Sequence, residues 1–151
     1  MMLKHLTAAG LMLVAFVALD AAAQVKPEIL VKQRKAAMTL QGKYFGPLAG
    51  MAQGKVPFNK DVVARNAGYL DALDKMPWDG FGESTKSEKS EALPSIWDKP
   101  GEFKQAQERL ENEVAKLVQL SKGGDEAAIK AQIGAVGKSC GGCHETFREK
   151  H

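Results

Sequence analysis

The stretch IKAQIGAVGKSCGGCHETF, residues 129–147, carries the two patterns that decide the fold of this chain. Its apolar residues recur at spacings of three and four, which is the period of an α-helix with one buried face. Because helix positions i, i+3 and i+4 share a face, Cys140, Cys143 and His144 lie in line with that apolar stripe. The sequence therefore predicts a C-terminal helix whose two thiols and one imidazole point toward the core.

Three earlier segments show the same helical period. The first follows Pro27, which suits the first turn of a helix; the second follows Asn59, a good N-cap residue; the third spans 103–120. Residues 77–101 form a long loop rich in glycine, serine, proline and charge, yet it holds two tryptophans and a phenylalanine that we expect to dock on apolar surface. Four amphipathic helices, with short links at two of the three junctions, predict an all-α, antiparallel four-helix bundle.

The N-terminal residues 1–23 have the layout of a secretory signal peptide, with a short basic start, an apolar run and small residues before Ala23. We expect cleavage there, which leaves one domain, residues 24–151, that works outside the cytoplasm, in the periplasm. No segment after Gln24 is long and apolar enough to cross a membrane. The net charge of +3, with both signs interleaved, argues against a nucleic-acid partner.

Cys140 and Cys143 are the only cysteines, and their spacing limits what they can do. A disulfide between them would strain a helix and add little stability, and a closed zinc site needs about four ligands where only three cluster. A thioredoxin-like pair needs a βαβ setting, for which the sequence shows no strands. C-x-x-C-H is the spacing that attaches a c-type haem, with one bond from each thiol and the iron bound by the histidine. The motif predicts one covalent haem c, with His144 as an axial iron ligand.

The sequence also restricts the sixth ligand position of such an iron. The other histidines, His5 and His151, lie in the signal peptide and at the last residue, which argues against a second histidine ligand. Met38 lies on the apolar stripe of the first helix, and three roles stay open for it. Its sulfur could bind the iron and favour electron transfer, its side chain could cover an open apolar site that admits small neutral diatomic gases, or it could simply fill the core.

Two arginines on the predicted helices lie near this site. Arg34 precedes Met38 by one turn, where it could pair with a haem propionate or lie at the surface edge of the stripe. Arg148 follows His144 by four residues, where it could tune the iron or offset the helix dipole. The stripe of the first helix offers Gln41 and Met38 but no histidine or carboxylate for acid–base chemistry, so we expect that the protein is not an enzyme.

Six motifs, taken together, resemble the cytochrome c prime family of class II c-type cytochromes, over essentially all of residues 24–151. They are KPEILVKQRKAAM (26–38), GKYFGPL (42–48), VPFNKD (56–61), MPWDGFG (76–82), LPSIW (93–97) and VGKSCGGCHETFREK (136–150). The resemblance implies a left-handed antiparallel four-helix bundle, usually a homodimer packed through its first two helices. It also implies a five-coordinate, high-spin haem c that binds nitric oxide and carbon monoxide and can undergo one-electron transfer.

The resemblance further implies roles for residues around the haem. Arg34 matches the arginine near the propionates, and Arg148 matches the basic residue beside the proximal histidine. Lys35 stands where the family commonly has a glutamine that touches the haem edge. The loop segment that reaches a propionate falls near Ser90 and Glu91.

Met38 separates two branches of this family. In the high-spin branch its position holds the residue that covers the distal face of the iron. In a sister group, the low-spin class II cytochromes typified by cytochrome c-556, a methionine at this position ligates the iron. The alternative to a gas-binding protein is therefore an electron carrier with Met38 as sixth ligand and a redox protein as partner.

Overall fold

The structure, a computed structural model, describes residues 25–150, so the predicted signal peptide at 1–23 and the terminal His151 lie outside the described residues. Four long helices make up most of it: α1 (Pro27–Ala52), α2 (Lys60–Leu73), α4 (Pro100–Ser121) and α5 (Glu126–Phe147). Three short elements lie between α2 and α4: η1 (Trp78–Phe81), η2 (Glu83–Thr85) and α3 (Ser95–Asp98). Within the described range, none of the helices carries an apolar run of the length that a bilayer requires.

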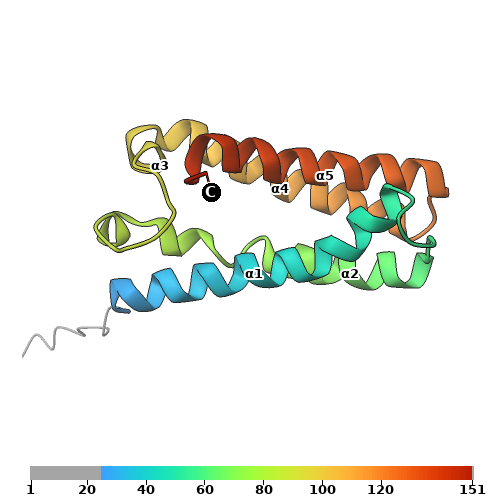
Figure 1. The fold of residues 1–151 in the computed structure, drawn as a ribbon, viewed down its shortest axis with the longest axis horizontal. Coiled ribbons are helices and arrows are strands. Elements are labelled where there is room, and N and C mark those ends of the chain that lie inside the picture. Colours follow the sequence, from blue (N-terminus) through green and yellow to red (C-terminus); the bar gives the residue numbers. More distant parts are fainter. Residues whose placement is uncertain (1–24, 151) are drawn as a thin grey trace, which may run out of the picture.

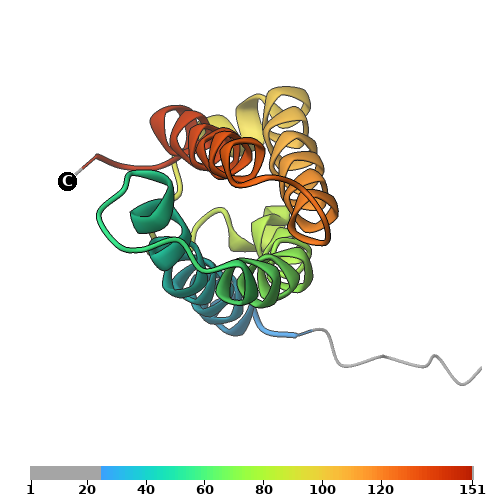
Figure 2. The same cartoon turned by 90° about the vertical axis from the view of Figure 1, so that its right-hand side faces the viewer.

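The long helices pack as an antiparallel four-helix bundle in two layers, which confirms the predicted fold class. α1 packs beside α2 in one layer, and α4 packs beside α5 in the other (Figure 1). Between the layers, α1 meets α5 and α2 meets α4, so the four helices surround a common centre in the end-on view of Figure 2.

The helix ends fall where the sequence supplies partners for free backbone groups. The side chain of Asn59 accepts a hydrogen bond from Val62 N at 3.0 Å at the start of α2. That of Asp125 accepts one from Ala128 N at 2.8 Å at the start of α5. Just beyond α1, Gly54 has a φ of 70°, which suits a residue without a Cβ. These ends produce the two short turns that make neighbouring helices antiparallel.

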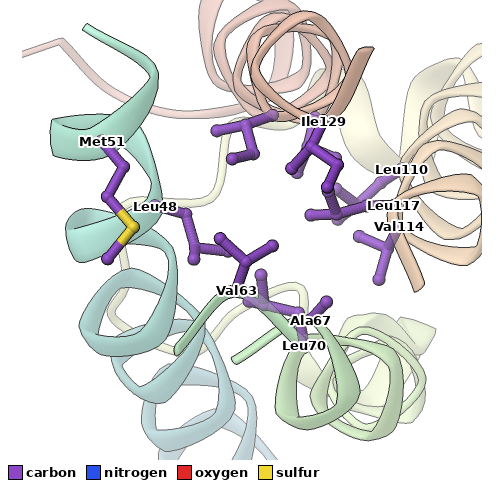
Figure 3. Packing of buried hydrophobic residues seen from close by; sticks show 11 residues of the cluster. Leu48, Met51, Val63, Ala67, Leu70, Leu110, Val114, Leu117 and Ile129 are labelled. Atoms are coloured by element: carbon purple, nitrogen blue, oxygen red, sulfur yellow. The ribbon is translucent and has the colours of Figure 1, made fainter. Parts of the chain in front are cut away.

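The apolar core fills the part of the bundle nearest the α1–α2 and α4–α5 turns. Its side chains come from all four long helices and point toward one another (Figure 3): Leu48, Met51, Val63, Ala67, Leu70, Leu110, Val114, Leu117, Ile129, Ile133 and Val136. Full burial of one leucine or isoleucine side chain contributes about 1.5–3 kcal/mol. This packed part fixes how the helices lie against one another, and the site forms in the other part.

The aromatic residues of the segment between α2 and α4 dock on the bundle, as predicted. The ring centre of Phe103 lies 5.0 Å from that of Phe81 and 5.2 Å from that of Phe147. Nε1 of Trp97 donates to Phe81 O at 2.9 Å, so the polar edge of this indole is also satisfied. Phe81 thus joins the loop to α4, and Phe103 of α4 in turn contacts α5.

Backbone hydrogen bonds tie the same segment to the end of α5. Leu93 N donates to Phe147 O at 3.0 Å, and Glu149 N donates to Glu91 O at 2.8 Å. The segment therefore crosses the end of the bundle that carries the C-x-x-C-H motif, and it closes one side of the site described next.

Candidate functional site

A cavity of about 560 Å³ lies between the two helix layers, at the end of the bundle that the loop crosses. Apolar side chains at the edge of the packed core form its floor, and they belong to that core: Leu70, Leu110, Val114 and Val136. Aromatic side chains line its walls: Phe45, Trp78, Phe81, Phe103 and Phe147. A volume of this order, with apolar walls and a few polar groups, is typical of a site for one organic cofactor or ligand.

The three residues of the C-x-x-C-H motif reach this cavity from α5. Cys140, Cys143 and His144 all line it, as the helical spacing predicts, and the two thiols are not joined in a disulfide. Within residues 25–150, no three histidine, cysteine or acidic side chains converge as they would around a metal ion held by protein alone. The motif residues are spread along one wall, which suits the attachment of a broad, flat group.

Burial is the main influence on the ionisation of these groups. It raises the pKa of the Cys140 and Cys143 thiols. It lowers the pKa of His144, which the charge of Arg148 lowers further and that of Glu91 raises. The neutral imidazole that this favours has the free lone pair that an iron ligand needs.

Met38 reaches the cavity from α1, in the helix layer opposite α5 (Figure 1). Its side chain is half-buried, and Gln41 and Phe45 lie on the same wall. The thioether is a soft donor that can bind iron, and it is also a flexible apolar cover. Met38 is therefore positioned for either of the two haem-related roles that the sequence left open.

Arg34 is buried, with 3% of its surface exposed, and it lines the cavity, so its alternative placement at the surface edge of the helix stripe is wrong. Its guanidinium donates to Gly80 O, to Thr85 Oγ1 at 3.3 Å and to Ser90 Oγ at 2.7 Å. It also lies 4.4 Å from the centre of the Phe81 ring. Arg34 thus fastens the loop to α1, which the sequence did not reveal. Burial lowers the pKa of Arg34, yet a guanidinium keeps its charge in proteins.

Glu91 and Arg148 form an ion pair at the cavity rim. Nε and Nη2 of Arg148 both lie 2.7 Å from Oε2 of Glu91. Arg148 follows the last residue of α5 and forms an isolated β-bridge with Ala92. Lys35 lines the cavity from α1 as an exposed side chain. All nine residues singled out in the sequence as candidate site residues line this one cavity: Arg34, Lys35, Met38, Ser90, Glu91, Cys140, Cys143, His144 and Arg148.

Sequence reasoning did not place Asp74 or Trp78 in the site, although both bring a polar group to the cavity. Asp74 caps the C-terminal end of α2, is buried, and lines the cavity together with Trp78. Neither Oδ2 of Asp74 nor Nε1 of Trp78 has a hydrogen-bond partner in the described part of the chain. Asp74 follows Leu70 by four residues, so extending the second helical stripe by one turn would have found it.

These features fit a c-type haem. Two thiols and an imidazole on one helix face can attach the ring and bind its iron, and the apolar floor and aromatic walls can enclose the ring. Arg34 and the unpaired indole N–H of Trp78 supply donors that suit carboxylates such as the haem propionates. Haem bound there would supply a redox-active iron.

Comparison with known proteins agrees with this fit. A family model described as "Cytochrome C'" matches residues 30–148. Cytochrome c' of Rubrivivax gelatinosus is 41% identical over 126 residues, which cover 83% of this chain and 98% of the relative. Its crystal structure matches with a TM-score of 0.78 and 40% identity, over 82% of this chain and 98% of that one.

Two further relatives bear on the chemistry. A cytochrome c-554 of Cereibacter sphaeroides is 35% identical over 145 residues, 90% of this chain and 92% of the relative. A nitric oxide complex of a cytochrome c prime variant from Alcaligenes xylosoxidans matches with a TM-score of 0.76 and 35% identity, over 83% of this chain and 98% of that one. Proteins of the matched family carry covalent haem c, and the two cysteines here are consistent with that attachment. This chain belongs to the cytochrome c' family.

Proposed function

We propose that this chain is a periplasmic haem protein that binds nitric oxide and carbon monoxide at a five-coordinate, high-spin haem c, that can undergo one-electron transfer, and that is not an enzyme. Cys140 and Cys143 attach the haem, and His144 is the axial ligand of its iron. The observation that carries the proposal is the α1 wall of the cavity, which presents Met38 and Phe45 from the helix layer opposite His144.

An apolar side chain over the sixth position favours neutral ligands. Water and anions lose hydration in such a place without gaining hydrogen-bond partners, whereas uncharged diatomic gases have little hydration to lose. A methionine side chain has three flexible bonds and can move aside for a small ligand. The nitric oxide complex of the Alcaligenes xylosoxidans relative supports this proposal, since that protein shares the fold at 35% identity.

The polar residues of the cavity surround the haem in this proposal. Arg34 and Ser90, already joined by a 2.7 Å hydrogen bond, lie near the propionates. Lys35 touches the haem edge. Arg148, held by Glu91, lies on the side of His144, where its charge disfavours a protonated imidazole.

The second candidate is a low-spin electron carrier in which the Met38 sulfur is the sixth ligand. The observation that favours it is the position of Met38 itself, on the cavity wall opposite the layer that carries His144. A closed iron site with methionine and histidine ligands suits electron transfer to a redox protein partner. The two candidates differ in one measurable respect, namely whether the ferrous iron has a free coordination position.

A homodimer packed through α1 and α2 is part of the proposal. The two helices expose large apolar side chains, with Leu40 39% and Tyr69 45% exposed. Tyr69 of α2 packs on Tyr44 of α1, with their ring centres 4.7 Å apart, and so extends this surface across both helices. An exposed apolar surface of this kind is typical of a subunit interface.

Carbon monoxide titration of the haem-loaded ferrous protein tests the gas-binding proposal. Wild type should bind the gas, and Met38→Ala should bind it more tightly without a change of spin state before the gas is added. Met51→Ala is the matched control, because Met51 is a buried methionine of α1 outside the cavity. It should leave carbon monoxide affinity unchanged. If wild type does not bind the gas, and Met38→Ala turns a low-spin iron into a high-spin one, the electron-carrier candidate is correct instead.

A further inference from the structure

Asp74 is a buried carboxyl in the wall of the haem cavity, with 1% of its surface exposed. Its backbone N–H donates to Leu70 O at 2.8 Å, which fixes the residue at the end of α2. Its Oδ1 lies 3.3 Å from Nζ of Lys75, whereas its Oδ2 has no hydrogen-bond partner within residues 25–150. A buried carboxylate with one unpaired oxygen is unfavourable, so this position is not explained by the stability of the fold.

The carboxyl and the axial histidine reach the cavity from different helix layers. Asp74 belongs to the α1/α2 layer, as does Met38, while His144 belongs to the α4/α5 layer (Figure 1). Nε2 of Gln41 donates to Leu73 O at 2.9 Å and so holds the end of α2 against α1. Haem held by α5 would therefore face this carboxyl across the cavity.

We propose that Asp74 is a proton-binding site of the haem cavity, and that one-electron reduction of the haem iron is accompanied by uptake of one proton on the Asp74 carboxyl. A one-electron donor supplies the electron and ferric iron becomes ferrous. Solvent supplies the proton, and the only bond formed is the O–H bond of the carboxylic acid. The proposal rests on the covalent haem alone and applies to five- and six-coordinate iron alike.

The physical reason is the charge of the iron. Reduction removes one positive charge from a cavity in which charges are weakly screened, so the ionised carboxylate loses part of its stabilisation and binds a proton more readily. Lys75 offers a route to solvent, because its ammonium group contacts Asp74 and is itself exposed.

The other charges around Asp74 come from several elements. Lys75 and Asp71 flank it at the end of α2, and Glu111 of α4 acts on it. Further titratable or charged groups line the same cavity: Arg34 and Lys35 of α1, Glu91 of the loop, Cys140, Cys143 and His144 of α5, and Arg148 beyond it. Burial is the largest influence and raises the pKa of Asp74 to about 6, with Lys75 acting in the opposite direction and Asp71 and Glu111 adding to the rise. The carboxyl is thus able to change its protonation close to neutral pH.

The test is the midpoint potential of the haem-loaded protein, measured by spectroelectrochemical titration from pH 5 to pH 8. In wild type the potential should fall as pH rises, with a slope that approaches about 59 mV per pH unit, the value for one proton per electron. Asp74→Asn cannot ionise, so it should lose this slope and have a higher potential than wild type at pH 8. Asp71→Asn is the matched control: Asp71 is exposed and pairs with the same Lys75 at 2.7 Å, but it does not line the cavity. This control should keep the wild-type slope.

A wild-type potential that does not change over this pH range would overturn the proposal without any variant. It would equally be overturned if Asp74→Asn kept the wild-type slope, because the proton would then bind elsewhere, for example on a haem propionate. If Asp74→Asn fails to take up haem, Asp74→Ser removes the same charge. Reduced-minus-oxidised infrared spectra of wild type give a second readout: a carboxylic acid C=O band should appear on reduction, and its absence contradicts the proposal.

Discussion

Arg148, the first residue beyond the haem-motif helix, is joined to Glu91 of the long loop, with Nε and Nη2 both 2.7 Å from Oε2. The two side chains are 46% and 43% exposed, so water screens their attraction, and pairs of this kind contribute about 0–1 kcal/mol. The neighbouring backbone bonds, from Leu93 N to Phe147 O and from Glu149 N to Glu91 O, attach the loop to α5 independently of it. The ion pair therefore adds little to the stability of the fold, and its main effect is to hold two charges at the cavity rim.

Replacing Glu91 by glutamine should therefore cost little stability. We expect the free energy of unfolding of Glu91→Gln, measured by urea denaturation, to fall by no more than about 1 kcal/mol. Ser95→Ala is a useful comparison, since it removes a neutral hydrogen bond of the same interface, from Ser95 Oγ to Thr146 O at 2.8 Å. If Glu91→Gln lowered the free energy of unfolding by more than about 2 kcal/mol, the pair would contribute more than an exposed ion pair does, and the prediction would be wrong.

Gly80 lies so close to α1 that a methyl group cannot be added without displacement. A Cβ at this position would lie 2.7 Å from Arg34 Cβ and 2.9 Å from Leu30 O. Overpacking of this kind costs about 1–3 kcal/mol, so Gly80→Ala should lower the urea midpoint. The control is Gly82→Ala, whose Cβ would meet only Asp79 O, at 3.7 Å. Equal losses in the two variants would contradict the close approach of loop and helix.

The buried carboxyl of Asp74 should make stability depend on pH. Burial raises its pKa from 3.8 to about 6, so the folded state holds the proton more tightly than the unfolded chain does. This contribution is complete below the unfolded pKa, and it is lost as pH rises through the folded pKa. The amide of Asp74→Asn does not titrate, so its free energy of unfolding lacks this pH dependence. Relative to wild type, the free energy of unfolding of the variant should therefore rise between pH 4 and pH 8, by up to about 3 kcal/mol. A difference that stays constant with pH would contradict this prediction.

The two cysteines should each hold the haem through one covalent bond. Mass spectrometry of the denatured wild-type protein should show the haem still attached. Cys140→Ser and Cys143→Ser should each retain haem through the remaining bond, and the double variant should release it on denaturation. Ser139→Ala, next to Cys140, is the control and should behave as wild type. Release of haem from denatured wild type would disprove covalent attachment.

The helical bundle could be predicted because each long helix carries its own signal. The stripe of α5 leads directly to Cys140, Cys143 and His144, and Asn59 marks the start of α2 with a cap that the structure confirms. The short elements η1, η2 and α3 could not be predicted, because long-range contacts stabilise them. The hydrogen bonds from Arg34 to Gly80 and Ser90 join residues that are 46 and 56 positions apart.

The polar residues of the site also divide into those that local sequence predicts and those that it does not. Local spacing identified the motif on α5 and Met38 on α1, and the family resemblance pointed to Ser90 and Glu91. Asp74 was not predicted because it lies one residue past the end of α2, beyond the last apolar residue of the stripe, and because an aspartate is rarely buried. The sequence analysis looked for a carboxylate only on the stripe of the first helix, whereas the loop and α2 supply Glu91 and Asp74 to the cavity.

The absorption spectrum of the ferrous, haem-loaded protein tests the central proposal most directly, before any gas is added. A five-coordinate, high-spin haem held by His144 alone predicts a broad, unsplit band in the visible region and a high-spin Soret shape. Sharp, split α and β bands would contradict it, since they would show a low-spin iron with Met38 as sixth ligand.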